Sequence, residues 1–246
     1  MTQRDPDSAP FSGLPALDPE EWRNATPDTW RSAFGEGNDH VLSPEFLREE
    51  AGEVARRLLG SVLVSELGNG RVEAVVVETE AYPGPHDPAS HAAERIGRTR
   101  RNHRMFGPPG TAYVYRSYGI HWCLNVVTGS EGYPAAVLIR GVDPMLGRET
   151  VRLRRWGREP LCAGPGRVCQ ALHVTGAQDG HPLHQEPLRL RGGWDIPVER
   201  VGVSGRVGVP RAADWPLRFY LPGHPQVTRP GGRVSRPPRS ERRDKA

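Results

Sequence analysis

The chain has 246 residues, of which 36% are hydrophobic, and its formal net charge is +4 at pH 7. This is enough for one sizeable core, as one domain with tails or as two small domains, and we expect one domain. No apolar run is long enough to span a bilayer, and the acidic, proline-broken amino terminus lacks the layout of a signal peptide. We therefore expect a cytoplasmic protein without a membrane partner, associated with the nucleoid if it is bacterial.

Charge is distributed unevenly along the chain. Residues 1–40 carry eight acids against three arginines and show no sustained hydrophobic period. This predicts a disordered or loosely docked acidic arm, with weak docking by Trp22 and Trp30. Residues 229–246 carry seven basic residues against two acids, which predicts a disordered basic tail. The folded domain is therefore expected at 41–228.

The domain opens with a predicted helix and two strands. Ser43 suits the N-cap and Pro44 the first helical position, and apolar residues at helical spacing continue to Leu59 before a glycine. Two strands follow, SVLVSE at 61–66 and RVEAVVVETE at 71–80, joined by a Gly-Asn-Gly loop.

The second of these strands ends in acidic and aromatic side chains. Because side chains alternate across a strand, Glu80 and Tyr82 point to one side while Val75 and Val77 pack on the other. A carboxylate in so apolar a run is costly unless it is paired or used. Glu80 is therefore either an ion-pair partner for an arginine or part of a functional site, to which His91, after a proline-rich loop, would also belong.

A basic segment and an aromatic hairpin come next. The basic segment places five arginines within ten residues: Arg95, Arg98, Arg100, Arg101 and Arg104. Such a cluster fits a phosphate backbone or, equally, a solvated loop of like charges. Residues 111–127 then predict two strands, with Tyr113 and Tyr115 on one face and Tyr118 near the turn.

The rest of the domain mixes strands and helices. We expect a buried strand at 135–141, helices at 147–157 and 166–174, and short strands at 188–191, 199–203 and 217–221. No repeat of 20–50 residues is visible. Strand pairs combined with a few helices predict an α+β fold with a mostly antiparallel sheet.

Six segments of the chain occur together in a distinctive order. They are ETEAYPGPHDPASH (78–91), RTRRNHRMFGPPGTAYVYRSYGIHWCLNVV (98–127), AAVLIRGVDP (135–144), GPGRVCQAL (164–172), ERVGV (199–203) and PLRFYLPG (216–223). Across residues 43–228 this set resembles the alkyladenine (3-methyladenine) DNA glycosylases of the methylpurine-DNA glycosylase type, and six ordered motifs are far more specific than one. The resemblance implies a compact single domain with a curved sheet, peripheral helices and a protruding β-hairpin that inserts into DNA.

The resemblance implies catalytic roles for three residues. Glu80 matches the general base, which takes a proton from water and stabilises the positive charge that develops on the deoxyribose. Arg140 matches a position that helps to hold this water, and its charge would keep Glu80 ionised. The main-chain carbonyl of Val201 matches a further water ligand. From the residues alone, the simpler interpretation of Arg140 is an ion pair with Asp143.

The resemblance also implies how a base is held outside the duplex. Tyr82, His91 and Tyr115 match an aromatic base pocket. Asn125 matches a position that rejects guanine by clashing with its exocyclic amine or by failing to satisfy it. Tyr118 matches the wedge that fills the vacated stack. From the residues alone, each pocket position could be ordinary core, and Tyr118 could be a hairpin-tip tyrosine covering the core.

Contacts to the DNA backbone are expected from five arginines. They are Arg98, Arg100 and Arg101 of the basic segment, together with the family-matched Arg155 and Arg167. Arg167 follows a Gly-Pro helix start, where main-chain N–H groups suit a phosphate.

The composition favours hydrolysis by water without a cofactor. The only lysine is Lys245, in the terminal tail, so no amine near the motifs can form a Schiff base with C1′. The three cysteines, Cys123, Cys162 and Cys169, lack zinc-site spacing and are expected to be buried free thiols. We predict neither a disulfide nor a metal nor a cofactor.

Taken together, the sequence predicts a monomeric, monofunctional glycosylase of base excision repair. Its partner would be duplex DNA containing damaged purines, with 3-methyladenine as the first substrate and hypoxanthine and etheno-adenine as further candidates. One alternative is a non-catalytic damaged-DNA-binding protein on the same scaffold, which would gain nothing from a buried carboxylate. Another is a hydrolase of nucleosides, which would not need the basic segment.

Overall fold

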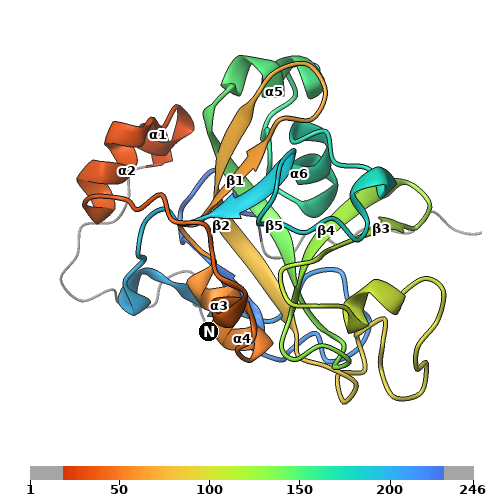
Figure 1. Cartoon of the computed structure of the whole chain (residues 1–246). Helices are drawn as coiled ribbons and strands as arrows, with labels where there is room; N and C mark the ends of the chain where they lie inside the picture. Colours follow the sequence, from red (N-terminus) through yellow and green to blue (C-terminus); the bar gives the residue numbers. More distant parts are fainter. Residues whose placement is uncertain (1–18, 230–246) are drawn as a thin grey trace, which may run out of the picture.

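The computed structural model describes residues 19–229, and an eight-stranded antiparallel sheet forms its centre (Figure 1). The strands are β1 (Val62–Ser65), β2 (Val72–Tyr82), β3 (Ala112–Ser117), β4 (His121–Thr128), β5 (Ala135–Leu146), β6 (Leu188–Arg191), β7 (Gly202–Ser204) and β8 (Arg218–Tyr220). Six of them follow the order β3-β4-β5-β2-β1-β6, and β8 pairs with both β2 and β7. The predicted α+β fold in a single compact domain is confirmed.

Short helices surround the sheet. They are α1 (Pro19–Arg23), α2 (Pro27–Phe34), α3 (Pro44–Leu47), α4 (Ala51–Arg57), α5 (Arg148–Arg154) and α6 (Pro165–Ala171). α4 packs on β2 and β5, α6 packs on β4 and β5, and the apolar side chains of both helices join one large buried core. On the other face of β3, β4 and β5, Tyr113, Val127 and Ala136 pack against Ala92 and Met105 of the long loop after β2. One face of the sheet thus packs against α4 and α6. The other is covered by the loop after β2 where it is formed by β3, β4 and β5, and by α1 and α2 where it is formed by β1 and β2.

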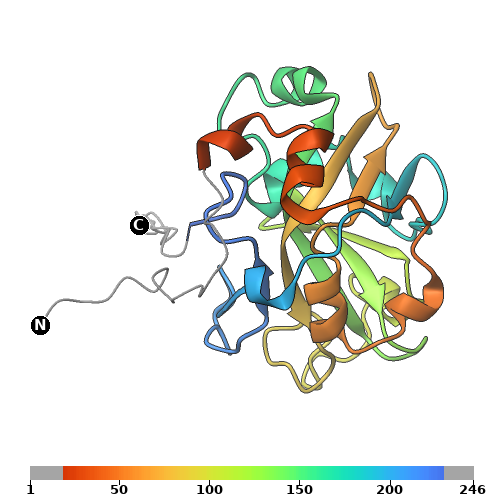
Figure 2. The ribbon, with the colours of Figure 1, turned by 90° about the vertical axis from the view of Figure 1, so that its left-hand side faces the viewer.

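The predicted amino-terminal arm is partly structured. Its residues 19–34 form α1 and α2, which lie against the sheet (Figure 2). Trp22 and Trp30 are fully buried in a cluster with Val75 and Val77 of β2. The expectation of loose docking is therefore wrong for this part of the arm. Each helix is too short to show a hydrophobic period, so the sequence pattern did not reveal it.

Two predicted elements differ in extent from the observed ones. The helix expected from Ser43 to Leu59 is two helices, because the chain is extended at Glu50, whose side chain accepts the N–H of Gly52 and starts α4 anew. The strand expected at 199–203 begins later, at β7, because the preceding residues form a short 3-10 helix, η3 (Val198–Arg200).

Several other expectations concern the whole chain. Cys123, Cys162 and Cys169 are buried free thiols, as predicted. Within residues 19–229, no helix is long and apolar enough to cross a membrane. The predicted basic tail lies outside the described residues, apart from its first residue, Arg229.

Candidate active site

One face of β2 presents three polar side chains in a row. Glu78, Glu80 and Tyr82 point the same way, since they are two residues apart on the strand. Glu80 lies opposite Arg218 of β8, and the pairing of β2 with β5 shifts register on both sides of Glu78. Such bulges re-aim side chains, and here Arg140 of β5 reaches both carboxylates.

Glu80 is fully buried but has few hydrogen bonds. Its Oε1 accepts the main-chain N–H of Val207 at 2.6 Å, and its Oε2 accepts the hydroxyl of Tyr82 at 3.1 Å. Arg140 Nε lies 3.4 Å from Oε1. Burial raises the pKa of Glu80 above its ordinary value, and the nearby charge of Glu78 adds to the rise. The expected pull of Arg140 toward the ionised form is present, but burial outweighs it.

Glu78, which the sequence did not single out, has many more donors. Its Oε1 accepts Arg218 Nε at 2.7 Å, Arg140 Nε at 3.1 Å and the hydroxyl of Thr228. Its Oε2 accepts the main-chain N–H of Thr228 at 2.8 Å. A fully buried carboxylate with this many donors is an anchoring point of the fold. Its position two residues before Glu80 on the same strand was the available sequence signal.

Arg140 serves both carboxylates and not Asp143. Its side chain is 5% exposed and spans Glu78 and Glu80. Asp143 instead accepts Trp30 Nε1 at 3.1 Å and Arg148 Nη2 at 2.9 Å. The simpler interpretation of Arg140 as a partner for Asp143 is therefore wrong.

An aromatic cluster stands on the same face of the sheet. His91 Nδ1 and the hydroxyl of Tyr113 are hydrogen-bonded at 2.9 Å, and the His91 ring meets the edge of Tyr115 at 4.4 Å between centroids. Burial lowers the pKa of His91 to about 4, with a contribution from Arg101, so the ring is neutral at pH 7. Burial also raises the pKa of Tyr115 well above its ordinary value, and Tyr82 is among the groups that add to the rise.

Asn125 lies in the row of residues that crosses the sheet from Glu80. It is opposite Leu138 of β5, which is opposite Glu80, and on its other side it faces Tyr113 of β3. The Asn125 side chain is buried, and its Nδ2 donates to the carbonyl of Tyr113 at 3.0 Å. The structure thus brings the predicted pocket residues and Glu80 to one face.

A buried ion pair joins the two loops beside this face. Arg206, in the loop after β7, donates through Nη1 and Nη2 to the two carboxylate oxygens of Asp87, in the loop after β2, at 2.5 and 2.9 Å. The Arg206 guanidinium also lies over the ring of Tyr82, 4.9 Å from its centroid. Both residues escaped the sequence analysis, because their pairing spans 119 residues.

The tip of the β3–β4 hairpin carries an unusual tyrosine. Tyr118 is 82% exposed and has a positive φ of 49°, and Gly119 follows with 69°. The N–H of Ile120 closes the turn on the carbonyl of Ser117 at 2.9 Å. A bulky residue at positive φ is disfavoured, so an exposed tyrosine here costs free energy without filling the core. The alternative, a tyrosine that covers the core, is wrong.

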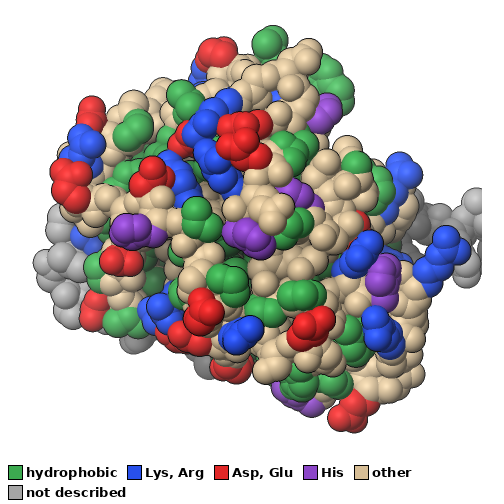
Figure 3. All heavy atoms as spheres, viewed as in Figure 1, with side chains coloured by type: hydrophobic (Ala, Val, Ile, Leu, Met, Phe, Trp, Pro, Cys, Tyr) green, Lys and Arg blue, Asp and Glu red, His purple; other side chains and the backbone are tan. Residues whose placement is uncertain are grey.

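The basic segment lies next to the aromatic cluster. Arg98, Arg100 and Arg101 are exposed, and within residues 19–229 none has an acidic partner within 4 Å. Arg101 lies over the ring of Tyr115 at 5.5 Å and donates to the carbonyl of Arg116 at 3.4 Å. Figure 3 shows basic side chains along the edge of the molecule where β3 and the preceding loop lie.

Comparison with known proteins settles the family. A family model described as methylpurine-DNA glycosylase (MPG) matches residues 45–225. The chain belongs to the methylpurine-DNA glycosylase family. A protein of Agrobacterium fabrum is 45% identical over 197 residues, which cover 76% of this chain and 94% of that protein. One from Nitrosospira multiformis is 47% identical over 182 residues, covering 72% and 89%, and one from Methanoculleus marisnigri is 42% identical over 194, covering 77% and 99%. All three are named "Putative 3-methyladenine DNA glycosylase".

The methylpurine-DNA glycosylase match includes three further predicted positions, whose surroundings differ. Arg155 is 8% exposed and turned inward, donating to the carbonyl of Leu161 at 2.9 Å and to the side chain of Gln170. Arg167 is exposed on the first turn of α6. Val201, whose carbonyl is predicted to be a water ligand, directly precedes β7. The main-chain N–H that Glu80 accepts belongs to Val207, which the sequence did not single out.

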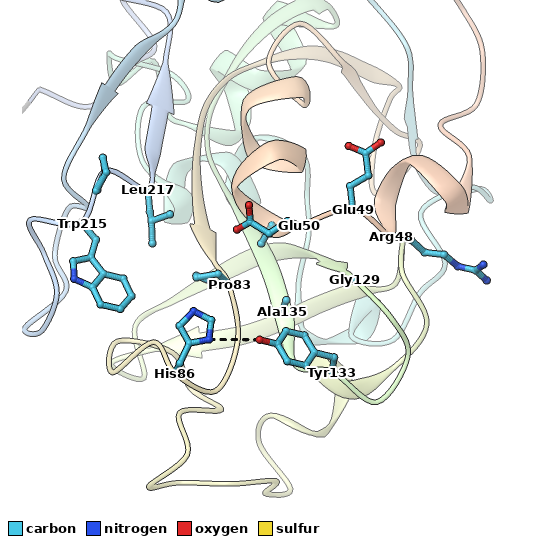
Figure 4. Close-up of a pocket in the computed structure, with 12 residues that line it drawn as sticks. Arg48, Glu49, Glu50, Pro83, His86, Gly129, Tyr133, Ala135, Trp215 and Leu217 are labelled. Atoms are coloured by element: carbon cyan, nitrogen blue, oxygen red, sulfur yellow. Dashed lines mark hydrogen bonds between the residues drawn. The ribbon is translucent and has the colours of Figure 1, made fainter.

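A cavity of about 380 Å³ lies apart from this site (Figure 4). Pro83, His86, Tyr133, Trp215 and Leu217 line it, together with residues at the start of α4. No residue that the sequence analysis placed in the methylpurine-DNA glycosylase site takes part in this lining. The cavity is lined by Pro83 and His86 of the loop that follows Tyr82, and it shares Ala51 and Ala135 with the helical core.

Proposed function

We propose that the chain is a monofunctional DNA glycosylase that removes alkylated purines, 3-methyladenine foremost, from duplex DNA by hydrolysis. Membership of the methylpurine-DNA glycosylase family supports glycosylase activity on DNA. One observation carries the mechanism: Glu80 is a fully buried carboxylate with a raised pKa, on the same face of the sheet as an aromatic cluster. Groups with such perturbed pKa values concentrate at functional sites.

Glu80 acts as the general base. Water attacks C1′ of the deoxyribose, one water proton passes to the Glu80 carboxylate, and the bond between C1′ and the purine nitrogen breaks with its electron pair leaving on the base. The carboxylate also stabilises the positive charge that the sugar develops. Arg140, 3.4 Å from Glu80, helps to orient the water, and the carbonyl of Val201 is proposed as a further water ligand.

The damaged purine is held outside the duplex by the aromatic cluster. Tyr118, already exposed at the hairpin tip, enters the stack in place of the extruded base. Tyr82, His91 and Tyr115 then sandwich the purine. The amide nitrogen of Asn125 donates to the Tyr113 carbonyl, which fixes this buried side chain in the pocket. There it would reject guanine by clashing with its exocyclic amine or by failing to satisfy it.

The reaction needs no amine nucleophile and no cofactor. The single lysine, Lys245, lies outside the described residues and outside the family match. The product is therefore an intact abasic strand. Borohydride should trap no covalent adduct between protein and DNA, and strand cleavage should appear only after added alkali.

DNA is held through exposed arginines on the surface. Arg98, Arg100 and Arg101 contact phosphates, and Arg167 is a further candidate. Arg155 has internal partners, so we propose it as a support for α6 and not as a phosphate contact. The enzyme acts as a cytoplasmic monomer in base excision repair, with hypoxanthine and etheno-adenine as further substrates.

Release of free bases from methylated duplex DNA tests this proposal. The purified protein is incubated with methylated duplex, and the released bases are identified by chromatography. We expect 3-methyladenine, with the strand left intact. Binding to the duplex without base release would favour a damaged-DNA-binding protein, and cleavage of free nucleosides would favour the small-molecule hydrolase.

A further inference from the structure

Both arginines that lie next to Glu80 are directed to Glu78. Arg140 Nε is 3.1 Å from Glu78 and 3.4 Å from Glu80, and its Nη2 donates to the Thr228 hydroxyl at 3.4 Å. Arg218 lies opposite Glu80 in the strand register, yet its Nε donates to Glu78 at 2.7 Å. Both arginines therefore make their shorter contact to Glu78, two residues before Glu80 on β2, and Glu80 keeps only the longer contact to Arg140.

The remaining donors of Arg218 are also occupied. Its Nη1 donates to the hydroxyl of Ser204 at 3.0 Å, and its Nη2 donates to the carbonyl of Thr228 at 2.6 Å. Thr228 in turn donates both its N–H and its hydroxyl to Glu78. An arginine frequently donates two parallel hydrogen bonds to a carboxylate that it pairs with. Neither Arg140 nor Arg218 donates such a pair of bonds to Glu80.

We propose that Glu78 is a positioning residue for the glycosylase reaction. Glu78 binds Arg140 and Arg218, so that neither forms a two-bond pair with Glu80. The hydrogen bonds that Thr228 donates to Glu78 hold this arrangement in place. Glu80 then keeps a poorly compensated charge, which makes it the stronger base. This inference rests on the proposed function, because it assigns the basicity of Glu80 to its neighbour. Thr228 lies three residues beyond the end of the family match at 225, so the family motifs do not contain it.

The charged groups around Glu80 are consistent with this role. They are Glu78 and Tyr82 of β2, Arg140 of β5, Arg218 of β8 and Arg206 of the loop after β7. Arg206 is paired with Asp87, so its charge is also compensated elsewhere. Within this set Glu78 is the anion whose charge raises the pKa of Glu80, in the same direction as burial. Removing that anion would leave two cations to face Glu80 alone.

The test is the pH dependence of base release by Glu78→Gln at saturating enzyme, in single turnover on methylated duplex. Glu80 must be ionised to act, so the rate falls as the pH drops through its pKa, the acid limb of the profile. With Glu78 neutral, the acid limb should move to lower pH by about one unit or more, and the plateau rate should fall because the base is weaker. Loss of stability alone would lower the rate without moving the acid limb.

Two further variants keep the test decisive if Glu78→Gln does not fold. Thr228→Val retains every charge and removes the hydroxyl that donates to Glu78 and accepts from Arg140. It should therefore move the acid limb in the same direction by a smaller amount. Ser204→Ala removes a hydroxyl whose partner is Arg218 and neither Glu78 nor Arg140, and it should leave the limb in place. Thermal melting checks that each variant is folded.

The outcomes separate this inference from the proposed function. An unmoved acid limb in folded Glu78→Gln, or in Thr228→Val where the first variant is unfolded, overturns the role of Glu78 while the wild-type protein still releases bases. Absence of base release by the wild-type protein instead overturns the proposed function itself.

Discussion

Two sets of charged residues in this protein, a buried network and an exposed rim, differ in their partners. In the network, Glu78, Glu80 and Arg140 are nearly or fully buried and are connected to one another. On the rim, Arg98, Arg100 and Arg101 face solvent without acidic partners among residues 19–229. Buried charges must be satisfied inside the protein, whereas exposed and unpaired cations are available to a polyanion.

Under the proposed glycosylase function, we assign a separate role to each region. The network would tune the Glu80 carboxylate and so govern the rate of bond cleavage. The rim, with Tyr118 at the hairpin tip, would govern how the duplex is engaged. Substitutions in one region should therefore leave the other function nearly intact, and the largest departure from wild-type behaviour is expected in the network.

Glu80→Gln should reduce base release by about 10²–10⁴-fold, since the amide cannot take a proton from water. The reduction should be larger still if charge stabilisation of the sugar is also lost. Binding to lesion-containing duplex should stay within a few-fold of the wild-type value, as measured by fluorescence anisotropy. A comparable loss of binding would mean that the network and the rim are not separate.

Tyr118→Ala should weaken engagement of the lesion by about 5- to 150-fold, the equivalent of about 1–3 kcal/mol for one lost base–aromatic stack. A fluorescent base analogue beside the lesion reports the loss. Trp156→Ala is a matched control, because Trp156 is also an exposed aromatic residue, 73% accessible, with a positive φ of 50°. The melting temperature should not change for either variant, and a large drop for Tyr118→Ala with normal base flipping would make it a structural residue.

Replacing Arg98, Arg100 and Arg101 together by Gln should flatten the slope of log affinity against log salt by about 2–3 units. Between 0.05 and 0.15 M salt, the affinity of the triple variant should therefore fall about 9- to 27-fold less than that of the wild-type protein. A control with the same change in charge replaces Arg31, Arg152 and Arg189, which form surface ion pairs with Asp28, Glu149 and Glu186. Equal slopes for the two triple variants would return the basic segment to an ordinary solvated loop.

The smallest expected effect concerns stability. Burial raises the pKa of Glu80 in the folded protein, so the folded state binds more protons than the unfolded state, and stability falls as the pH rises through this range. At pH 7.5 the ionised carboxylate is therefore a cost, and Glu80→Gln should raise the melting temperature by about 2–4 °C, the shift for about 1 kcal/mol in a protein of this size. The gain should vanish below the ordinary pKa of glutamate. A gain that does not depend on pH would contradict burial of the carboxylate as its cause.

Local patterns in the sequence predicted much of this site. Alternation along β2 places Glu80 and Tyr82 on one face, and the ordered motifs identify the family. The expectation that Val75 and Val77 pack on the opposite face is wrong, because a bulge at Val77 brings them to the face of Glu80, away from Val76 and Ala81. Contacts between distant segments were beyond such patterns. Glu78 depends on Arg218 and Thr228, 140 and 150 residues away, and the burial of Trp30 depends in part on Asp143, 113 residues away. Short-range periodicity contains no information on pairings at these separations.

The most direct test of this division of labour is the single-turnover rate of base release at saturating enzyme, measured on one methylated duplex for Glu80→Gln and for the triple variant of Arg98, Arg100 and Arg101. Saturation removes differences in binding, so the rate reports the chemistry alone. We expect Glu80→Gln to lose at least about 100-fold and the triple variant to stay within about threefold of the wild-type rate. A Glu80→Gln rate above a tenth of the wild-type rate, or an equal loss in both variants, would contradict the assignment of catalysis to the buried network.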